Sequence, residues 1–164
     1  MLRPAASLIA ILLLFLTASS WAEEVTENDL FMSIYEHFQL WNDCQPIGLI
    51  VEGMGKDASD IGLEEEALTR AVRSRLRSAR IYDANASSSL YVQVSVVRAA
   101  FSIKMSYYKP MTDQASGATF SATSWDTGST GTHGRNSGYI LSAVSEHMDK
   151  FIDDYLRVNS DACE

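Results

Sequence analysis

Residues 62–97 constrain the fold more than any other part of this 164-residue chain. Their first half has apolar side chains at the three- and four-residue spacing of an amphipathic helix, for which Asp60 or Gly62 is a candidate cap. The apolar positions are Leu63, Ala67, Leu68, Ala71, Val72, Leu76 and Ala79. After a polar loop, apolar and polar residues alternate over residues 90–96, as in a strand with one buried face. This stretch therefore predicts a fold that combines helices with a sheet.

The first 22 residues predict a signal peptide that is removed from the domain. Arg3 supplies a positive charge, residues 8–16 are uniformly apolar, and Ser20 and Ala22 are small residues where a signal peptidase reads the chain. A retained membrane anchor is the alternative, but the apolar run is shorter than the ~20 residues of a membrane span. We therefore expect one exported α/β domain over residues 23–164, periplasmic or secreted, without a membrane span after signal removal.

Cys44 and Cys163 predict one disulfide bond. An exported chain meets an oxidising compartment, and an even cysteine count without a CxxC spacing favours a structural bridge over a redox pair or a metal site. Closing a loop of ~120 residues stabilises a fold by about 4–5 kcal/mol in the chain-entropy description. The three histidines have no HExxH or paired spacing. We expect no metal and no cofactor.

The formal net charge of −8 argues against two classes of partner. Nucleic acids and anionic membranes bind basic surfaces. The arginines of this chain cluster on one predicted helix behind Glu64, Glu65 and Glu66, an arrangement typical of a solvated helix face. We expect no nucleic-acid partner, and another envelope protein is the partner class that remains.

Two further helices are predicted, one at each end of the domain. Apolar residues recur at helical spacing over residues 30–41 and again over residues 140–156, where Asn136 or Ser137 can cap the helix. Between the first two helices, residues 47–51 form a short apolar run whose length suits a buried strand.

Residues 98–100 decide how many strands follow. The apolar positions alternate again over residues 101–107, but out of phase with the preceding strand. A tight turn normally needs Gly, Asn or Asp, none of which is present here, whereas one extra residue in a bulge returns the apolar set to the same face. We therefore favour one long bent strand over residues 90–109 and keep a turn as the alternative. The hairpin turn is then at residues 110–117, and the returning strand covers residues 118–127.

These elements predict an α+β domain with a three-stranded mixed sheet. A right-handed β-α-β unit is extended by an antiparallel hairpin, two long helices cover one face, and an extra helix precedes them. Over residues 47–158, this order resembles the βαββα periplasmic domains, such as the amino-terminal domain of TolB and relatives in outer-membrane assembly proteins. The resemblance is one of topology without a shared motif, so it implies a fold and not an activity.

The candidate binding site is a glycine-rich segment that we expect to form a loop. Gly128, Gly131 and Gly134 have the spacing GxxGxxG ahead of a helix, where backbone N–H groups can hold an anion. The segment lacks the Lys-Ser/Thr of a Walker loop. An ordinary surface loop is the alternative interpretation.

His133 is the one histidine placed like a catalytic or ligand residue, because it lies in this segment near Asp126 and Ser129. No GxSxG pattern marks a nucleophile, and a triad would have to be assembled in space. His147 is expected on the solvated flank of the last helix. The expected binding residues are Trp125, Asp126, Gly128, Gly131, His133 and Gly134, and no catalytic residue is assigned.

The sequence leaves three hypotheses for the function. The first is a non-catalytic exported domain that binds a protein or an envelope component, with aromatic residues of the hairpin exposed to the partner. The second is a small hydrolase or anion-binding enzyme that uses residues 128–134. The third is a structural subunit of an envelope assembly. The small size and the lack of a catalytic motif favour the first.

Overall fold

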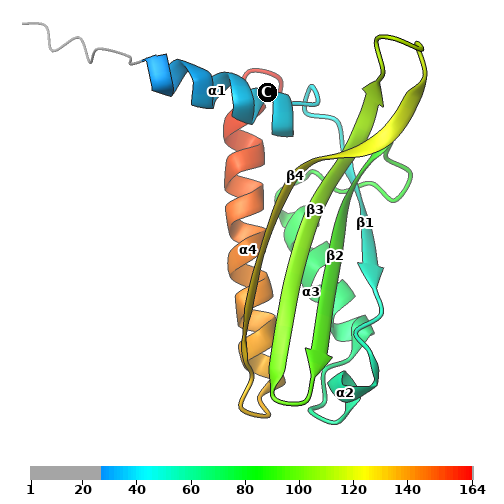
Figure 1. Ribbon diagram of the computed structural model, residues 1–164, viewed down its shortest axis with the longest axis vertical. Helices are drawn as coiled ribbons and strands as arrows, with labels where there is room; N and C mark the ends of the chain where they lie inside the picture. The colour runs from blue at the N-terminus through cyan, green and yellow to red at the C-terminus, as the bar shows by residue number, and fades with distance from the viewer. Residues whose placement is uncertain (1–26, 164) are drawn as a thin grey trace, which may run out of the picture.

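A four-stranded mixed sheet forms one layer of the structure, and the long helices pack on one of its faces (Figure 1). The computed structural model describes residues 27–163, and the predicted signal peptide lies outside the described residues. The elements in chain order are α1 (Glu27–Leu40), β1 (Ile47–Glu52), α2 (Lys56–Ser59), α3 (Glu65–Ser78), β2 (Ser88–Val97), β3 (Ala100–Thr112), β4 (Thr119–Thr132) and α4 (Ser137–Val158). In space the strands follow the order β1-β2-β3-β4, with β1 parallel to β2 and the other pairs antiparallel. The predicted α+β class with a mixed sheet is confirmed.

The apolar stripes of α3 and α4 meet the apolar positions of the sheet in one core. In β2, every second residue is buried, as the period-two pattern predicts. The helices contribute Leu68, Val72, Leu76, Ile140, Val144, Met148, Phe151 and Tyr155 to this core. Because α3 and α4 also contact each other, both lie on the same face of the sheet (Figure 1).

The predicted long bent strand is wrong, because residues 98 and 99 form a tight turn between β2 and β3. The two strands pair antiparallel from Val97 and Ala100, next to the turn, to Ser89 and Tyr108. Arg98 adopts a left-handed φ of 55° although it is not a glycine. Contacts from distant parts of the chain compensate for this conformation. The backbone N–H of Arg98 donates to Asp57 Oδ2 at 3.0 Å, and the backbone N–H of His133 donates to Ala99 O at 3.1 Å. The sheet therefore has four strands instead of three.

Two helices also differ from the prediction. The four-residue α2 was not predicted, and α3 begins after Glu64, whereas Asp60 or Gly62 was the expected cap. Asn136 caps α4, since its side-chain oxygen accepts from two backbone N–H groups of the first turn. With the additional strand and α2, the order from β1 onward is no longer the βαββα order that the topological resemblance implied.

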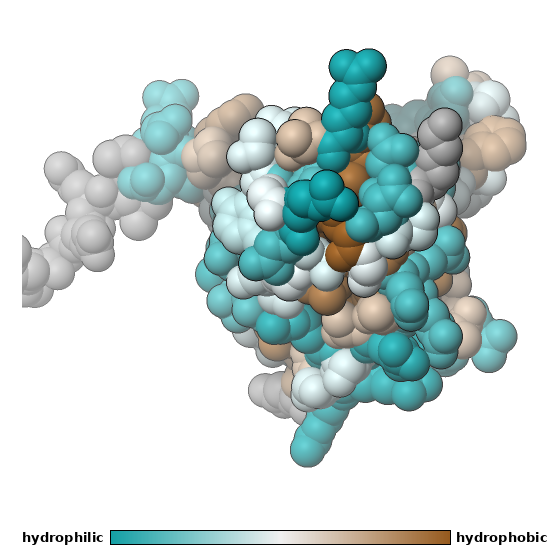
Figure 2. Space-filling model, turned by 90° about the horizontal axis from the view of Figure 1, so that it is seen from below, coloured by the Kyte–Doolittle hydropathy of each residue, from teal (hydrophilic) through white to brown (hydrophobic). Residues whose placement is uncertain are grey.

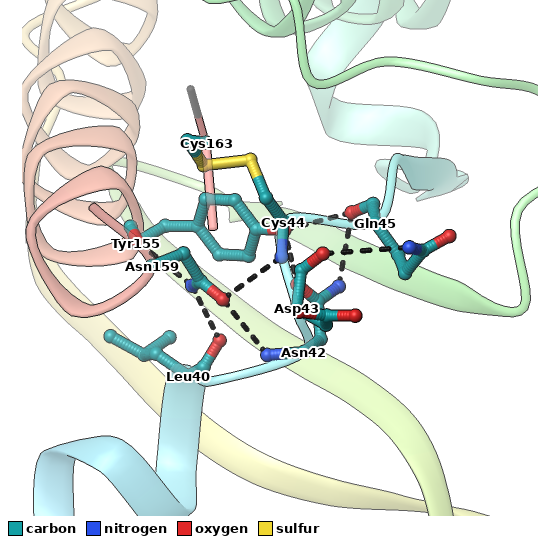
Figure 3. The surroundings of a disulfide bond; sticks show 8 residues. All are labelled: Leu40, Asn42, Asp43, Cys44, Gln45, Tyr155, Asn159 and Cys163. Carbon is teal, nitrogen blue, oxygen red and sulfur yellow. Dashed lines mark hydrogen bonds between the residues drawn. A yellow bond between two sulfur atoms is a disulfide. The ribbon is translucent and has the colours of Figure 1, made fainter. Parts of the chain in front are cut away.

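The predicted disulfide between Cys44 and Cys163 is present (Figure 3). It joins the segment after α1 to the residues after α4, with a Cα–Cα distance of 5.2 Å and a sequence separation of 119. Asp43 and Cys44 both have left-handed φ angles, 61° and 50°, so the chain turns sharply between α1 and β1. The bridge keeps the carboxy-terminal residues beside the end of α1 (Figure 1).

A buried asparagine reinforces the same junction (Figure 3). Asn159 is 1% exposed, and its Nδ2 donates to Leu40 O at 3.1 Å and to Tyr155 O at 2.9 Å. Its Oδ1 accepts from the backbone N–H groups of Asn42 at 3.0 Å and Cys44 at 3.2 Å. The amide therefore has a partner for both of its donor hydrogens and two for its acceptor. This one side chain connects the end of α4 to the residues that follow α1.

Candidate functional site

The glycine-rich segment that predicted a ligand loop is mostly strand. Residues 128–132 belong to β4 and pair with β3, so the loop interpretation of this part is wrong. A Cβ atom at Gly128 would clash with the backbone oxygen of Ile103, and one at Gly131 would lie 2.9 Å from the ring of Phe101. Both glycines therefore allow close packing inside the sheet. Each has a structural reason to be glycine that involves no ligand.

His133 is buried and supports two turns at one end of the sheet. Its Nε2 lies 2.7 Å from Arg98 O, and its Nδ1 accepts from the backbone N–H of Arg135 at 3.0 Å. These partners assign the neutral ring with the proton on Nε2. Gly134, with φ of 54°, lets the chain turn directly afterwards. The ring nitrogens are thus engaged with backbone groups of the protein, and the side chain stabilises the β2–β3 turn.

The remaining predicted site residues do not share a surface with His133. Trp125 is buried, and its ring centroid lies 5.1 Å from that of Phe151 of α4. Asp126 is exposed and, as the next residue along β4, projects to the other face of the sheet. The structure therefore brings none of the three side chains Trp125, Asp126 and His133 together.

A serine–histidine contact that was not predicted joins β4 to α4. Ser129 Oγ lies 2.9 Å from Nε2 of His147, which is half-buried instead of fully solvated. A catalytic triad also needs a carboxylate that orients the histidine and donors for the oxyanion. Among residues 27–163, no hydrogen bond or ion pair connects His147 to a carboxylate. The contact is adequately explained as a link between strand and helix.

The face of the sheet that the helices leave uncovered carries a polar cluster. Tyr91 and Gln93 of β2 both donate to the carboxylate of Glu52. The hydrogen bond to Glu52 raises the pKa of Tyr91 to about 12. Tyr108 packs edge-on against Tyr91 at 6.1 Å, whereas its neighbour Tyr107 is fully buried on the helix side. Of the two adjacent tyrosines, only Tyr108 is available on this open face.

The most extensive exposed apolar surface of the described chain lies on α1. Seven of the eleven large apolar residues that are exposed lie between Leu30 and Trp41, and Leu40 is the one buried residue of α1. Viewed along the helix axis, with 100° of rotation per residue, six of these side chains lie within an arc of about 140°. Five of these residues belong to α1, and Trp41 follows directly, with its backbone N–H donating to His37 O at 3.0 Å. We call the six residues the α1 apolar face: Leu30, Phe31, Ile34, Tyr35, Phe38 and Trp41.

The domain holds α1 by its backbone and by its polar side, so that the apolar face is left uncovered. Lys109 Nζ donates to the carbonyl oxygens of Phe38 at 2.5 Å and Trp41 at 3.0 Å, and burial lowers the pKa of this lysine. The oxygen of Gln39 accepts from Ser124 Oγ at 2.7 Å. The oxygen of Leu40 accepts from the buried Asn159. The carbonyls of the four consecutive residues 38–41, at the end of the helix, therefore all accept hydrogen bonds from other parts of the domain.

The polar side of α1 also faces the domain. Glu36 forms an ion pair with Arg157 of α4, with Nη1 and Oε2 2.7 Å apart. The amino-terminal half of α1 projects beyond α4 and the sheet (Figure 1). The opposite end of the molecule, where α2 and the β2–β3 turn lie, has mainly hydrophilic and neutral side chains with smaller hydrophobic areas (Figure 2).

Comparison with known proteins adds no family to these observations. No protein-family model, curated protein or solved structure matches the chain. Within residues 27–163, no helix has both the length and the apolar character needed to cross a membrane. The α1 apolar face is the surface feature that the packing of the domain itself leaves unexplained.

Proposed function

We propose that this chain is a non-catalytic exported domain that binds another protein through the α1 apolar face. One observation carries the proposal: six large apolar side chains, each 41–63% exposed, share one side of a helix whose other side holds the domain. Exposed apolar patches of this kind mark interaction sites in soluble proteins. Four of the six residues are aromatic, the type that is enriched where interfaces gain most of their affinity.

A protein partner fits this face better than a lipid surface does. Helices that lie in a membrane interface combine an apolar face with Lys and Arg on the polar face. Residues 27–41 contain no Lys or Arg, and they include Glu27, Asp29 and Glu36. The formal charge of the whole chain is −8. Anionic lipids would therefore be repelled by the residues that flank the apolar face.

The two other functions have less support. A hydrolase would need a nucleophile, a base and a carboxylate that act together. The described residues offer a Ser129–His147 contact without a carboxylate and a His133 that is bonded to backbone groups. A structural subunit of an envelope assembly would use the same apolar face, and it differs from the proposed function only in the permanence of the contact.

Site-specific photocrosslinking tests the proposal. A photoreactive amino acid is placed at Phe31 in the full chain, expressed in the native host, and the control carries it at Gln114 in the exposed β3–β4 turn. We expect discrete crosslinked products from position 31 and none of them from position 114. The additional substitution Phe38→Asp on the same face should remove the products. Equal products from both positions, or none from position 31, would refute the proposal.

A further inference from the structure

We infer that the partner of the α1 apolar face is α1 of a second copy of the chain, packed antiparallel across a two-fold axis. The inference rests on the proposed function and names the partner for the same surface. It is carried by the stability of the helix, the size of the face and the distribution of charge along α1.

α1 needs a covering partner to remain a helix along its whole length. It has 14 residues, and only Leu40, at its end, is buried. Isolated helices shorter than about 12–15 residues are marginally stable in water. Lys109, Ser124, Asn159 and Arg157 contact residues 36–41 of α1, whereas every residue of its first two turns is exposed. A second helix laid along the apolar face would cover these turns.

The size of the apolar face matches what a stable pair requires. A fully exposed aromatic side chain presents roughly 150–250 Å², so exposures of 41–63% leave on the order of 600 Å² on the six residues. Two copies that face each other would bury about 1,200 Å², the lower limit of a standard specific interface. A second copy also brings a surface of the same length and the same apolar chemistry.

The charge distribution selects the antiparallel arrangement. Glu27 and Asp29 lie in the first turn of α1, whereas the ammonium of Lys109 lies at its last turn, and the carboxylate of Glu36 near that end is paired with Arg157. A parallel pair would place the acidic first turns beside each other. An antiparallel pair places each acidic turn beside the basic end of the other helix and opposes the two helix dipoles. Such a contact is isologous and closes at two copies.

Sedimentation velocity tests the inference. The protein is expressed from the whole sequence and is purified in the form that the cell exports. Over a hundredfold range of concentration, the mass should change from one chain to two. Ile34→Asp should raise the dissociation constant at least about 100-fold, because the two-fold axis brings two carboxylates into one apolar interface. Tyr139→Asp is the matched control, since Tyr139 is exposed in the first turn of α4, where a carboxylate is tolerated. It should leave the dissociation constant within about threefold.

Crosslinks from position 31 report the orientation and separate the inference from the proposed function. In the antiparallel pair, they should reach the last turn of α1 in the second copy, near Phe38. A protein that stays a single chain at every concentration, or crosslinks between positions 31 of both copies, would overturn the inference. If single chains still give crosslinks from position 31 to a different protein, the proposed function stands and the second copy is excluded. If single chains give no crosslinks from position 31, both fail.

Discussion

Replacing Asn159 by alanine removes the side chain that ties the end of α1 to the end of α4. The amide makes four hydrogen bonds of 2.9–3.2 Å in a buried position. In the variant, the backbone N–H groups of Asn42 and Cys44 lose their acceptor, and Leu40 O loses its donor. Tyr155 O keeps the backbone N–H of residue 159 at 3.0 Å. Three backbone groups are therefore left without these partners.

The loss of stability follows from these three groups. A buried polar group that loses its partner costs about 1–3 kcal/mol, and a typical hydrogen bond contributes about 0.5–1.5 kcal/mol net. The bonds to Asn42 and Cys44 are only partly buried, so water can replace the acceptor there at the lower cost. We expect Asn159→Ala to lower the free energy of unfolding by about 3 kcal/mol. The matched control, Asn136→Ala, removes the exposed cap at the other end of α4 and should cost about 1 kcal/mol.

Urea denaturation followed by far-ultraviolet circular dichroism measures both differences. The Cys44–Cys163 bridge is kept oxidised, and every variant is measured at one protein concentration because self-association shifts the apparent stability. The free-energy differences come from the midpoints, provided that the denaturant slopes agree. If Asn159→Ala costs no more than Asn136→Ala, the buried amide does not anchor the junction as its hydrogen bonds indicate.

Three further predictions test the core, the sheet and its open face. Leu76→Asp places a carboxylate in the core and should abolish the cooperative thermal transition, whereas Arg77→Ala removes an exposed stacking contact and should cost at most about 1 kcal/mol; equal melts would contradict this. Gly128→Ala forces a side chain against the neighbouring strand and should destabilise by about 1–3 kcal/mol in thermal melts, so an unchanged melting temperature would refute the packing argument. Glu52→Gln should lower the pKa of Tyr91 from about 12 toward 10.0, followed by nuclear magnetic resonance of the ring. The folded state binds the phenol proton of Tyr91 more tightly than the unfolded state does. The hydrogen bond to Glu52 therefore contributes fully to stability below pH 10, and this contribution is lost as the pH rises from 10 to about 12. A pKa of Tyr91 that stays near 12 in the variant would exclude Glu52 as the cause.

The elements that the sequence predicted well are those that bury one side against the core. α3, α4 and β2 show clear periods of 3.6 or 2 because one face of each is covered and the other is solvated. The disulfide was predictable for a different reason, since two cysteines in a chain with a predicted signal peptide have few alternatives. In each case the information is local or compositional, and no knowledge of the tertiary arrangement is required.

The turn between β2 and β3 was not predictable from its own residues. Arg98 and Ala99 are poor turn residues, and the conformation is held by Asp57 from α2 and by His133 after β4. These groups are 30 or more positions away in the sequence, so a rule about local turn chemistry cannot include them. These contacts give His133 a structural role, although in the sequence it resembled a binding residue. A polar side chain that is required for a tertiary contact and one that binds a ligand look alike in a single sequence.

For the α1 apolar face, the sequence predicted the helix but not the surroundings of its apolar side. The three- and four-residue spacing correctly predicted a helix over residues 30–41, but a period does not reveal which surface covers the apolar side. The structure shows that the domain does not cover it. The available signal was the lack of any Lys or Arg in this segment together with four aromatic residues, a composition closer to an interface than to a solvated helix.

The anchor of α1 and its apolar face depend on each other. A segment with this many apolar side chains, tethered loosely, would fold back onto any apolar surface of the domain. Here the domain binds four consecutive carbonyls at the end of the helix, through Lys109, Ser124 and Asn159, and the Cys44–Cys163 bridge fixes the chain just beyond them. These hydrogen bonds are made to the backbone of the helix, and the ammonium of Lys109 also lies 5.6 Å from the ring centroid of Phe38. The polar junction is therefore what allows α1 to present its apolar face outward, and the stability measured at Asn159 is also a measure of how firmly that face is positioned for a partner.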